Sequence, residues 1–463
     1  MRFRFFIDFF RAIFTFFLIK CIMRFKFLEK FESFYFIGVG GVSMSGLAKY
    51  VLSLGKRVGG SDISANEYTD ELVKLGAEIS LLSEADDVAD YDVIVYTDAI
   101  KENDIRLCRA KELSKVIIPR GQFLYEVSRN FKKVIAVAGC HGKTTCTSML
   151  AHVFSAAGKK FTVHIGGNDL TFANFYCSGN DFFITEACEY KKNFLLLKPD
   201  ISVILNSDAD HLECYESEEE LKEAYLHFAD SADVAVSLYC DLPVSYGLSF
   251  GFDKSADYYA KNIKSSVGEY SFTVFEGATE LGVVNLSVYG KHNVLNALAA
   301  TAAARSAGIP FEFIKEGLAS FSGVERRFEH IGKINCAECI ADYAHHPAEL
   351  RATIRTAKKL TSGKLFVVFQ PHTYSRTKNL FKQFVKVLSP LNNLLVYKTF
   401  AAREYFDDAG SALTLSQCLK KSRYGEDLSD IKEFISKAEE GDLVLFLGAG
   451  DIYFIAKNLL ART

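Results

Sequence analysis

Residues 139–145 have the residue types and spacing needed to bind a nucleotide phosphate. They read Gly-Cys-His-Gly-Lys-Thr-Thr, which is shorter than the common phosphate-loop pattern, whose first glycine would fall on Val137. Glycines let backbone N–H groups turn inward and cradle phosphates. Lys143 would place its charge on the outer phosphates, and the Thr144 hydroxyl can ligate Mg²⁺. The alternative is a glycine turn before an ordinary helix with a solvated lysine, and we favour an ATP or GTP site.

The elements on either side of this segment are those that a phosphate loop requires. Residues 134–137 are Val-Ile-Ala-Val, which predicts a buried parallel strand that leads into the loop. The residues from Lys143 onward have helical character. The order of strand, loop and helix therefore places the loop at a helix N-terminus, where anions bind.

Acidic residues and a histidine follow two further predicted strands. Glu186 follows the strand over residues 181–185, and Asp208 and His211 follow the strand over residues 201–205. Sheets of this class place their sites at the carboxyl ends of strands. A carboxylate and a neutral imidazole near a nucleotide suit a Mg²⁺ site, although Mg²⁺ usually prefers oxygen. The alternative is that Glu186 and Asp208 are helix caps.

An alanine-rich helix is predicted to begin just after residue 290. His292, Asn293 and Asn296 lie within about its first turn, so their side chains can converge on a ligand. Asn293 could instead be only an N-cap.

A second glycine-rich segment follows the predicted strand at residues 34–37. It is close to a dinucleotide-binding fingerprint, but Ser43 occupies the position of the third glycine. Asp62 ends a second short strand at residues 57–60, a spacing that suits ribose or base recognition. The pattern leaves open a dinucleotide site, another diphosphate site and a structural turn. The candidate binding residues are Gly38, Gly40, Gly41, Ser43, Ser45 and Asp62.

Histidines and an arginine gather at predicted strand ends in the last third of the chain. Asp342, His345 and His346 stand in one segment, and His372 and Arg376 follow the strand over residues 365–369. Neighbouring histidines are often only polar surface. Their position at strand ends favours a second substrate subsite here.

Length and composition bound the architecture. At about 150 residues per domain, 463 residues suggest about three domains. Alternating strands and helices predict an α/β fold, with an N-terminal Rossmann-like domain, a central P-loop ATPase-type domain and a C-terminal Rossmann-like domain.

A net charge of −3 gives no electrostatic footprint for nucleic acid. Eleven scattered cysteines are typical of reduced cytosolic thiols. The expected boundaries are 1–23 for an extension, then 24–131, 132–328 and 329–463.

Residues 1–22 are rich in phenylalanine with charges interspersed. The longest uncharged run, residues 12–19, is too short to span a bilayer, which needs about 20 residues. An interfacial helix is one reading. We prefer the reading in which Met23 is an alternative start and the fold begins near Arg24.

Ten motifs, in order along the chain, resemble those of the Mur ligase family, the ATP-dependent amide-forming enzymes of peptidoglycan precursor synthesis. They cover the chain from about residue 34 to residue 452. The matching segments are residues 38–48, 61–62, 139–145, 186–189, 208–212, 290–296, 326–328, 342–347, 370–377 and 448–451.

The resemblance implies a ligase that joins L-alanine to the lactyl carboxylate of UDP-N-acetylmuramate through an acyl phosphate, using ATP and Mg²⁺ in the cytoplasm. No nucleic-acid or stable membrane partner is implied, and a monomer and a dimer are both open. The first domain would bind the UDP end of the sugar nucleotide, through the six residues named above. The central domain would bind ATP, and the last domain would bind the amino acid.

Residue roles come from the same resemblance. The ATP contacts would be Gly139, Cys140, His141, Gly142, Lys143, Thr144, Thr145, His292, Asn293, Asn296, Arg327 and Asp342. The metal ligands would be Thr144, Glu186 and His211. The L-alanine contacts would be His345, His372 and Arg376. The catalytic residues would be Lys143, Glu186, His211, Arg327 and His345.

The chain departs from the family pattern at three places. Cys188 stands where an aspartate is more often seen, which removes one carboxylate near the metal region. Leu226 stands where several sibling ligases have a carbamylated lysine, so we expect no carbamylation; the nearest lysine is Lys222. Thr373 stands where many relatives have arginine, which leaves Arg376 as the clearer carboxylate partner.

Three other functions compete with this prediction. A ligase that attaches a preformed peptide to the same sugar nucleotide is the alternative within the family. An NAD-dependent dehydrogenase could explain the first glycine segment, but it leaves residues 139–145 and the last domain unexplained. An ATPase that couples hydrolysis to movement lacks a convincing Walker B strand ending in aspartate.

Overall fold

The computed structural model describes residues 26–81, 83–208, 214–266, 269–402 and 404–461. The predictions about residues 1–22, Met23, Arg24 and His211 fall outside this part of the chain. The chain divides into two compact units. The first comprises residues 1–262, 272–284 and 295–321, and the second comprises residues 263–271, 285–294 and 322–463. Each unit is described by itself.

The first sheet is parallel, and its order β3-β2-β1-β4-β5 is that of a Rossmann fold without its sixth strand. Because successive strand residues face opposite sides, Phe34 and Phe36 of β1 pack on Phe123 on one face, and Tyr35 and Ile37 enter the core on the other. Its strands are β1 (Ser33–Ile37), β2 (Arg57–Ser61), β3 (Glu78–Ser80), β4 (Val93–Tyr96) and β5 (Val116–Pro119). Its helices are α2 (Lys26–Glu29), α3 (Val42–Ser53), α4 (Glu67–Lys74), η1 (Ala85–Val88), α5 (Ile105–Glu112) and α6 (Arg120–Ser128).

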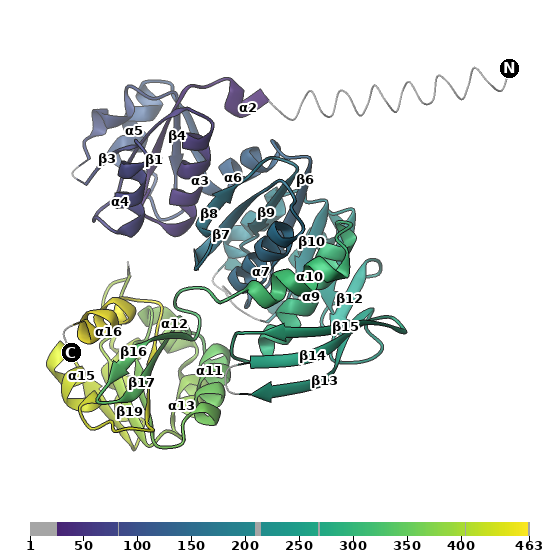
Figure 1. Ribbon diagram of the computed structural model, residues 1–463. Helices are drawn as coiled ribbons and strands as arrows, with labels where there is room; N and C mark the ends of the chain where they lie inside the picture. The colour runs from purple at the N-terminus through teal and green to yellow at the C-terminus, as the bar shows by residue number, and fades with distance from the viewer. Residues whose placement is uncertain (1–25, 82, 209–213, 267–268, 403, 462–463) are drawn as a thin grey trace. The chain divides into compact units, whose positions relative to one another are not determined.

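The second sheet has the order β15-β14-β13-β12-β11-β10-β6-β9-β7-β8, drawn in blue to green in Figure 1. Parallel strands flank β6, and β8 returns antiparallel to β7. Its strands are β6 (Lys133–Ala138), β7 (Phe161–Asp169), β8 (Ala173–Cys177), β9 (Phe182–Glu186), β10 (Ile201–Ile204), β11 (Val234–Leu238), β12 (Leu248–Gly251), β13 (Tyr258–Ser266), β14 (Glu269–Glu276) and β15 (Thr279–Leu286). Its helices are α7 (Lys143–Ala156), η2 (Tyr190–Leu196), α8 (Glu218–Asp230), α9 (His292–Ser306) and α10 (Phe311–Ser320).

Glycines allow two close approaches within the first unit. A Cβ at Gly317 of α10 would lie 2.4 Å from the Val153 Cα of α7, so the two helices touch at backbone distance. A Cβ at Gly46 of α3 would lie 2.7 Å from the His164 ring on β7. The first and second sheets share one hydrophobic core, which includes Phe34 and Ala136. The glycine-rich segment and the phosphate loop therefore belong to one packed body.

The third sheet, in the second unit, has the order β16-β17-β21-β18-β19-β20, with β16 antiparallel to β17. Apolar clusters cover both of its faces. Its strands are β16 (Glu329–Ile334), β17 (Ala337–Asp342), β18 (Leu365–Phe369), β19 (Asn393–Tyr397), β20 (Ser422–Gly425) and β21 (Leu443–Leu447). Its helices are α11 (Pro347–Leu360), α12 (Tyr374–Asn379), α13 (Phe381–Leu388), η4 (Asp408–Gly410), α14 (Ala412–Gln417), α15 (Leu428–Ile435) and α16 (Ile452–Leu460).

The predicted α/β class is confirmed, with three sheets, and so are the strands that were expected to carry site residues. The expected domain boundaries stay a prediction. The prediction missed the β7–β8 hairpin and the edge strand β16. The apolar alternation of β16 is weak. In the part of the chain that the structure describes, no helix is both long and apolar enough to cross a bilayer.

Candidate active site

The phosphate loop connects β6 to α7 through two glycines in left-handed conformations. Gly139 has φ +129° and Gly142 has φ +85°. Gly142 is the N-cap of α7 and has no side chain to cap it. A Cβ at Gly142 would lie 2.5 Å from the Asn296 Oδ1, so only glycine fits there without a shift. The predicted strand, loop and helix are thus present, and the first turns of α9 lie against the loop.

Lys143 is held inside the loop and is not solvated. Its Nζ donates to the Gly139 carbonyl oxygen at 2.6 Å and to both carboxylate oxygens of Glu189 at 3.0 Å. The Glu189 side chain is almost fully buried. Burial opposes protonation of the amine, but the Glu189 carboxylate outweighs burial, so the pKa of Lys143 lies above its usual value. A fixed cation therefore stands at the start of α7. Glu189, the last residue of the segment 186–189, is a candidate site residue to which the sequence alone assigned no role.

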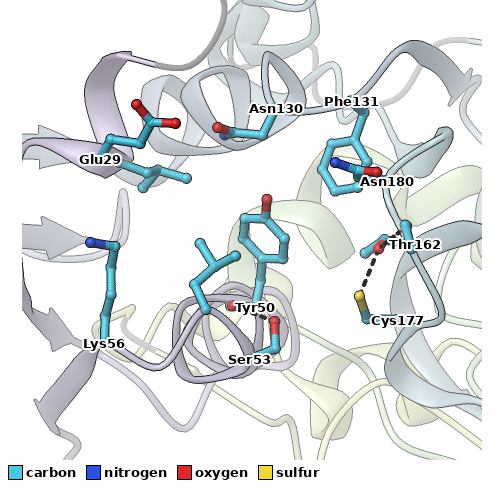
Figure 2. Close-up of a pocket in the computed structure, with 12 residues that line it drawn as sticks. Glu29, Tyr50, Ser53, Lys56, Asn130, Phe131, Thr162, Cys177 and Asn180 are labelled. Atoms are coloured by element: carbon cyan, nitrogen blue, oxygen red, sulfur yellow. Dashed lines mark hydrogen bonds between the residues drawn. The ribbon is translucent and has the colours of Figure 1, made fainter.

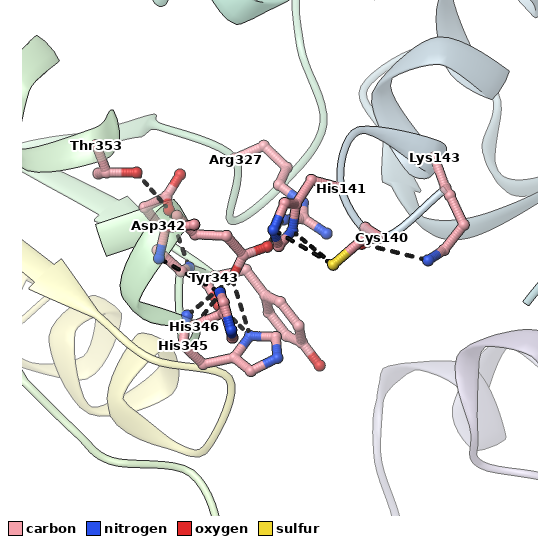
Figure 3. A network of polar contacts seen from close by, with 12 residues as sticks. Cys140, His141, Lys143, Arg327, Asp342, Tyr343, His345, His346 and Thr353 are labelled. Atoms are coloured by element: carbon pink, nitrogen blue, oxygen red, sulfur yellow. Dashed lines mark hydrogen bonds and ion pairs between the residues drawn. The ribbon is translucent and has the colours of Figure 1, made fainter. Parts of the chain in front are cut away.

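Asn206 fastens the other side of the loop. Its Oδ1 accepts from the His141 N–H and its Nδ2 donates to the His141 carbonyl oxygen, both at 3.0 Å. The Cys140 Sγ lies 3.3 Å from the His141 Nε2 (Figure 3). Asn206 lies two residues after β10, so its place near a strand end was the sequence signal for it. The loop's shape is thus set by its neighbours as well as by its glycines.

Two oxygen donors for a cation lie at the same end of the sheet. Glu186 ends β9, whose register pairs it with Val137 just before the loop, and Thr144 is in the first turn of α7. The Glu186 Oε1 accepts from the Gly166 N–H at 2.5 Å. A hydroxyl and a carboxylate are the donor chemistry that Mg²⁺ prefers. Among the described residues, no three His, Cys, Asp or Glu side chains form a metal cluster, and Mg²⁺ binding stays a prediction.

The residues predicted on α9 all lie in its first two turns. Asn296 contacts the phosphate loop as described above. The Asn293 Nδ2 donates to the Tyr289 carbonyl oxygen at 2.6 Å, so this side chain fixes the helix entry. The His292 ring packs where a side chain at Gly290 would stand.

The glycine loop at residues 38–46 is braced from outside by Asp62 and Asn66. The Asp62 Oδ2 accepts from the Gly40 N–H at 2.8 Å, and the Asn66 Nδ2 donates to the Gly40 carbonyl oxygen at 3.0 Å. A Cβ at Gly40 would lie within 3 Å of both side chains. Gly38 has φ +84°. The structure therefore brings Asp62 to the loop, where it holds the backbone.

The two serines of the loop have different surroundings. Ser45 is fully buried; its hydroxyl donates to the Val42 carbonyl oxygen and accepts from the Asn174 Nδ2, so it joins α3 to β8. The Ser43 carbonyl oxygen accepts from the His164 Nε2 at 3.0 Å. Burial lowers the pKa of His164 to about 4, so this ring is neutral at pH 7.

In the second unit, Asp342 ends β17 and organises the turn that follows. Its Oδ1 accepts from the Ala344 N–H at 2.9 Å and from the Thr353 hydroxyl at 3.1 Å, and its Oδ2 accepts from the Phe328 N–H at 2.8 Å (Figure 3). Burial raises the pKa of Asp342 to about 6, against the opposing effect of Arg327. The carboxylate thus joins the 326–328 segment to β17, and a ribose contact stays a prediction.

His345, His372 and Arg376 are brought together in the second unit, as predicted. The His345 and His372 ring centroids are 5.8 Å apart, and the Arg376 Nη1 lies 3.4 Å from the His372 Nδ1. Burial lowers the pKa of His372 to about 3, and the electrostatic effects of His345 and Arg376 act in the same direction. Thr373, between them in sequence, has φ +67°, a strained backbone of the kind found at functional sites. His346 instead caps α11.

Arg327 lies in a segment with unusual backbone. Its neighbours Arg326 and Phe328 have φ +61° and +52°. The Arg327 guanidinium stands 5.1 Å from the Tyr343 ring centroid and 3.8 Å from the Glu349 Oε1. The side chain is therefore oriented by the residues that follow β17.

A separate pocket of about 430 Å³ opens in the first unit between α3 and the residues that enter β6 (Figure 2). Tyr50 and Phe131 form part of its wall, and Lys56 and Asn130 stand at its edge. Its lining contains none of the predicted site residues.

Comparison with known proteins places these features in one family. Residues 33–132 match the Mur ligase family catalytic domain, residues 137–304 the Mur ligase middle domain, and residues 326–450 the Mur ligase glutamate ligase domain.

Similar proteins of known name cover almost the whole chain. UDP-N-acetylmuramate–L-alanine ligase of Clostridium beijerinckii is 37% identical over 95% of this chain and 100% of its own length. The ligase of the same name from Clostridium acetobutylicum is 39% identical over 93% of this chain and 98% of its own. The crystal structure of UDP-N-acetylmuramate–alanine ligase from Thermotoga maritima superposes with a TM-score of 0.81 at 30% identity, covering 93% and 98% of the two chains. The chain belongs to the Mur ligase family.

Proposed function

We propose that this chain is an ATP-dependent ligase that joins L-alanine to the lactyl carboxylate of UDP-N-acetylmuramate, giving UDP-N-acetylmuramoyl-L-alanine, ADP and phosphate for peptidoglycan synthesis. The observation that carries the proposal is that relatives named for this reaction match the chain over nearly its full length at 37–39% identity. The phosphate loop with its buried Lys143–Glu189 pair supplies the chemistry that such a reaction needs.

The carboxylate of one substrate must approach the anionic triphosphate of the other. The reaction forms an acyl phosphate and ADP, and the amine of L-alanine then displaces phosphate from the acyl carbon. Two anions approach only when cations stand between them. We assign Lys143 to the outer phosphates, because its charge is fixed at the N-terminus of α7. Mg²⁺, when bound, would supply further charge neutralisation at the phosphates.

Within the first unit the remaining assignments follow from position. Thr144 and Glu186 are the described residues that would hold Mg²⁺, since both present oxygen at the loop end of the sheet. Asn296 is assigned to the nucleotide because it lies against Gly142. The glycine loop at residues 38–46 is assigned to the UDP group of the sugar nucleotide, because it leads into the N-terminus of α3.

Within the second unit we assign the amino acid to His345, His372 and Arg376. Arg376 can form a bidentate, charge-assisted pair with a carboxylate. His372 is neutral at pH 7, so it can accept or donate without adding charge. Arg327 is assigned to ATP phosphate charge. ATP and Mg²⁺ are the proposed cofactors, and the cytoplasm, where UDP-sugars are made, is the proposed location.

A ligation assay tests the proposal directly. The full chain is incubated with ATP, Mg²⁺, UDP-N-acetylmuramate and, in separate reactions, L-alanine, glycine, L-serine or a tripeptide, and ADP release is measured. We expect L-alanine to give the highest kcat/KM. Faster turnover with the tripeptide would assign the chain to peptide attachment instead. No ADP release that depends on the sugar nucleotide would refute the ligase.

A further inference from the structure

A cluster of charged and polar side chains lies beside the glycine loop and has no role in the function proposed above. It is formed by Asp98, which follows β4; Arg120, the first residue of α6; and Lys191 and Asn193 of η2. The Asn193 Nδ2 donates to the Asp98 Oδ2 at 3.0 Å, the Lys191 Nζ lies 3.6 Å from the Asp98 Oδ1, and the Arg120 Nη2 lies 4.0 Å from the Asp98 Oδ2. We refer to these four residues as the Asp98 cluster.

The backbone at η2 is strained where it meets this cluster. Lys191 has φ 52° and ψ 28°, and Lys192 has φ 58° and ψ 22°, so two successive residues with side chains are left-handed. Such strain persists only where the surroundings impose it, and it gathers at functional sites. Gly121 permits the arrangement, because a Cβ there would lie 2.3 Å from the Asn193 Oδ1. The fold thus holds η2 tightly against the start of α6.

Arg120 extends from this cluster to the glycine loop. Its Nη1 lies 3.5 Å from the Ser43 hydroxyl, in the first turn of α3. Its side chain is only 14% exposed. The N-cap of α3 is Gly41, which has no side chain to cap the helix. A partly buried guanidinium and the positive end of a twelve-residue helix therefore face the same place, from two different elements.

The charges in the cluster do not cancel. Arg120 and Lys191 are cations, Asp98 is the anion between them, and the neighbouring His164 is neutral at pH 7. The separation of 4.0 Å between Arg120 and Asp98 is too long for a tight bidentate pair. Asp98 therefore orients the Arg120 guanidinium. The N–H donors of the guanidinium can still bind an anion such as a diphosphate.

We propose that Arg120 binds the diphosphate of the sugar nucleotide, with Asp98, Lys191 and Asn193 positioning its guanidinium. The identity of the ligand rests on the proposed function; the diphosphate chemistry rests on Arg120, Ser43 and the N-terminus of α3. Arg120 thereby supplies the cation that the glycine loop itself lacks.

The test compares Arg120→Gln with Arg129→Gln in the full chain. Arg129 follows the same helix and pairs with Glu126 at 3.4 Å, so it is a matched arginine away from the glycine loop. Binding of UDP-N-acetylmuramate and of UDP is measured by calorimetry, and binding of uridine, which has no phosphate, by saturation-transfer NMR. We expect Arg120→Gln to weaken both diphosphates about 10- to 100-fold and to leave uridine and the KM for ATP unchanged.

Three results would overturn the proposal: wild-type affinity of Arg120→Gln for UDP, an equal loss of uridine binding, or no binding of UDP by the wild-type chain. Arg120→Lys provides a second variant in case Arg120→Gln does not fold, and it should restore part of the affinity, since it keeps the charge and loses the fork. The proposed function fails separately: a wild-type chain that binds the sugar nucleotide but does not ligate L-alanine would refute the ligase and leave the Arg120 result standing.

Discussion

The phosphate loop at residues 139–145 and the glycine loop at residues 38–46 are both strand–turn–helix segments, but they obtain positive charge differently. The phosphate loop contains its own cation, Lys143, held by Glu189 from the segment after β9. The glycine loop contains no cation, and Arg120 of α6 approaches it instead. Under the proposed function, the loop that stabilises the reacting phosphate has its charge on its own helix. The loop that holds the diphosphate takes its charge from a neighbouring element.

The largest expected effect is that of Lys143→Ala. Loss of the loop cation removes charge stabilisation where charge develops, so kcat should fall at least about 100-fold at saturating ATP. Steady-state ADP release measures this. Lys132→Ala, which removes an exposed lysine just before β6, is the control and should stay within twofold of wild type. If Lys143→Ala retained more than a tenth of the wild-type kcat, the assignment of Lys143 to the catalytic site would be wrong.

The glycines of the two loops should differ in tolerance. Gly142→Ala imposes a left-handed alanine and a contact at 2.5 Å with Asn296, so the free energy of unfolding should fall by about 2–3 kcal/mol. Gly41 has φ −72°, and its Cβ would meet nothing closer than 3.5 Å, so Gly41→Ala should cost less than about 0.5 kcal/mol. Denaturant unfolding of both variants tests the difference. Equal destabilisation would contradict it.

Arg376 of the second unit offers a cation outside both loops. Arg376→Ala removes a charge-assisted carboxylate contact, so the KM for L-alanine should rise about 10- to 100-fold while the KM for ATP stays the same. Kinetics at varied L-alanine and at varied ATP separate the two constants. If Arg376→Ala left the KM for L-alanine unchanged, the assignment of the amino-acid site to His345, His372 and Arg376 would be wrong.

The buried His164 holds the glycine loop through the Ser43 carbonyl oxygen, so the stability of this part of the chain should be sensitive to acid. His164 has a folded pKa of about 4, below its ordinary value of 6.5, so the unfolded chain binds the proton more readily and stability falls as pH drops from 6.5 toward 4. Between pH 7.5 and pH 5 the loss should be about 2 kcal/mol. His164→Gln, whose amide can still donate to the Ser43 carbonyl oxygen, should abolish this part of the pH dependence in denaturant unfolding. An identical pH profile in the variant would assign the loss to other groups.

The sequence predicted what lies within one strand–turn–helix segment. Apolar runs identified β6, β9 and β10, and glycine spacing identified both loops. It did not predict contacts between segments that are far apart in the chain. Glu189 pairs with a lysine 46 residues earlier, and Arg120 reaches a serine 77 residues earlier. The hydrophobic periodicity of a short segment does not predict such pairings, because they depend on which strands become neighbours in the sheet.

The segment from Glu189 to Asn193 contacts the phosphate loop directly and is connected to the glycine loop through Asp98 and Arg120. Glu189 pairs with Lys143, and Lys191 and Asn193 hold Asp98 beside Arg120. Two successive residues in it, Lys191 and Lys192, are left-handed, so we expect a displacement at one end of the segment to affect the other end. Suppose that a nucleotide bound at residues 139–145 changes the affinity for the sugar nucleotide by some factor. By thermodynamic linkage, the sugar nucleotide then changes the affinity for the nucleotide by the same factor. Any such coupling is reciprocal, and we expect it to act through the five residues from Glu189 to Asn193.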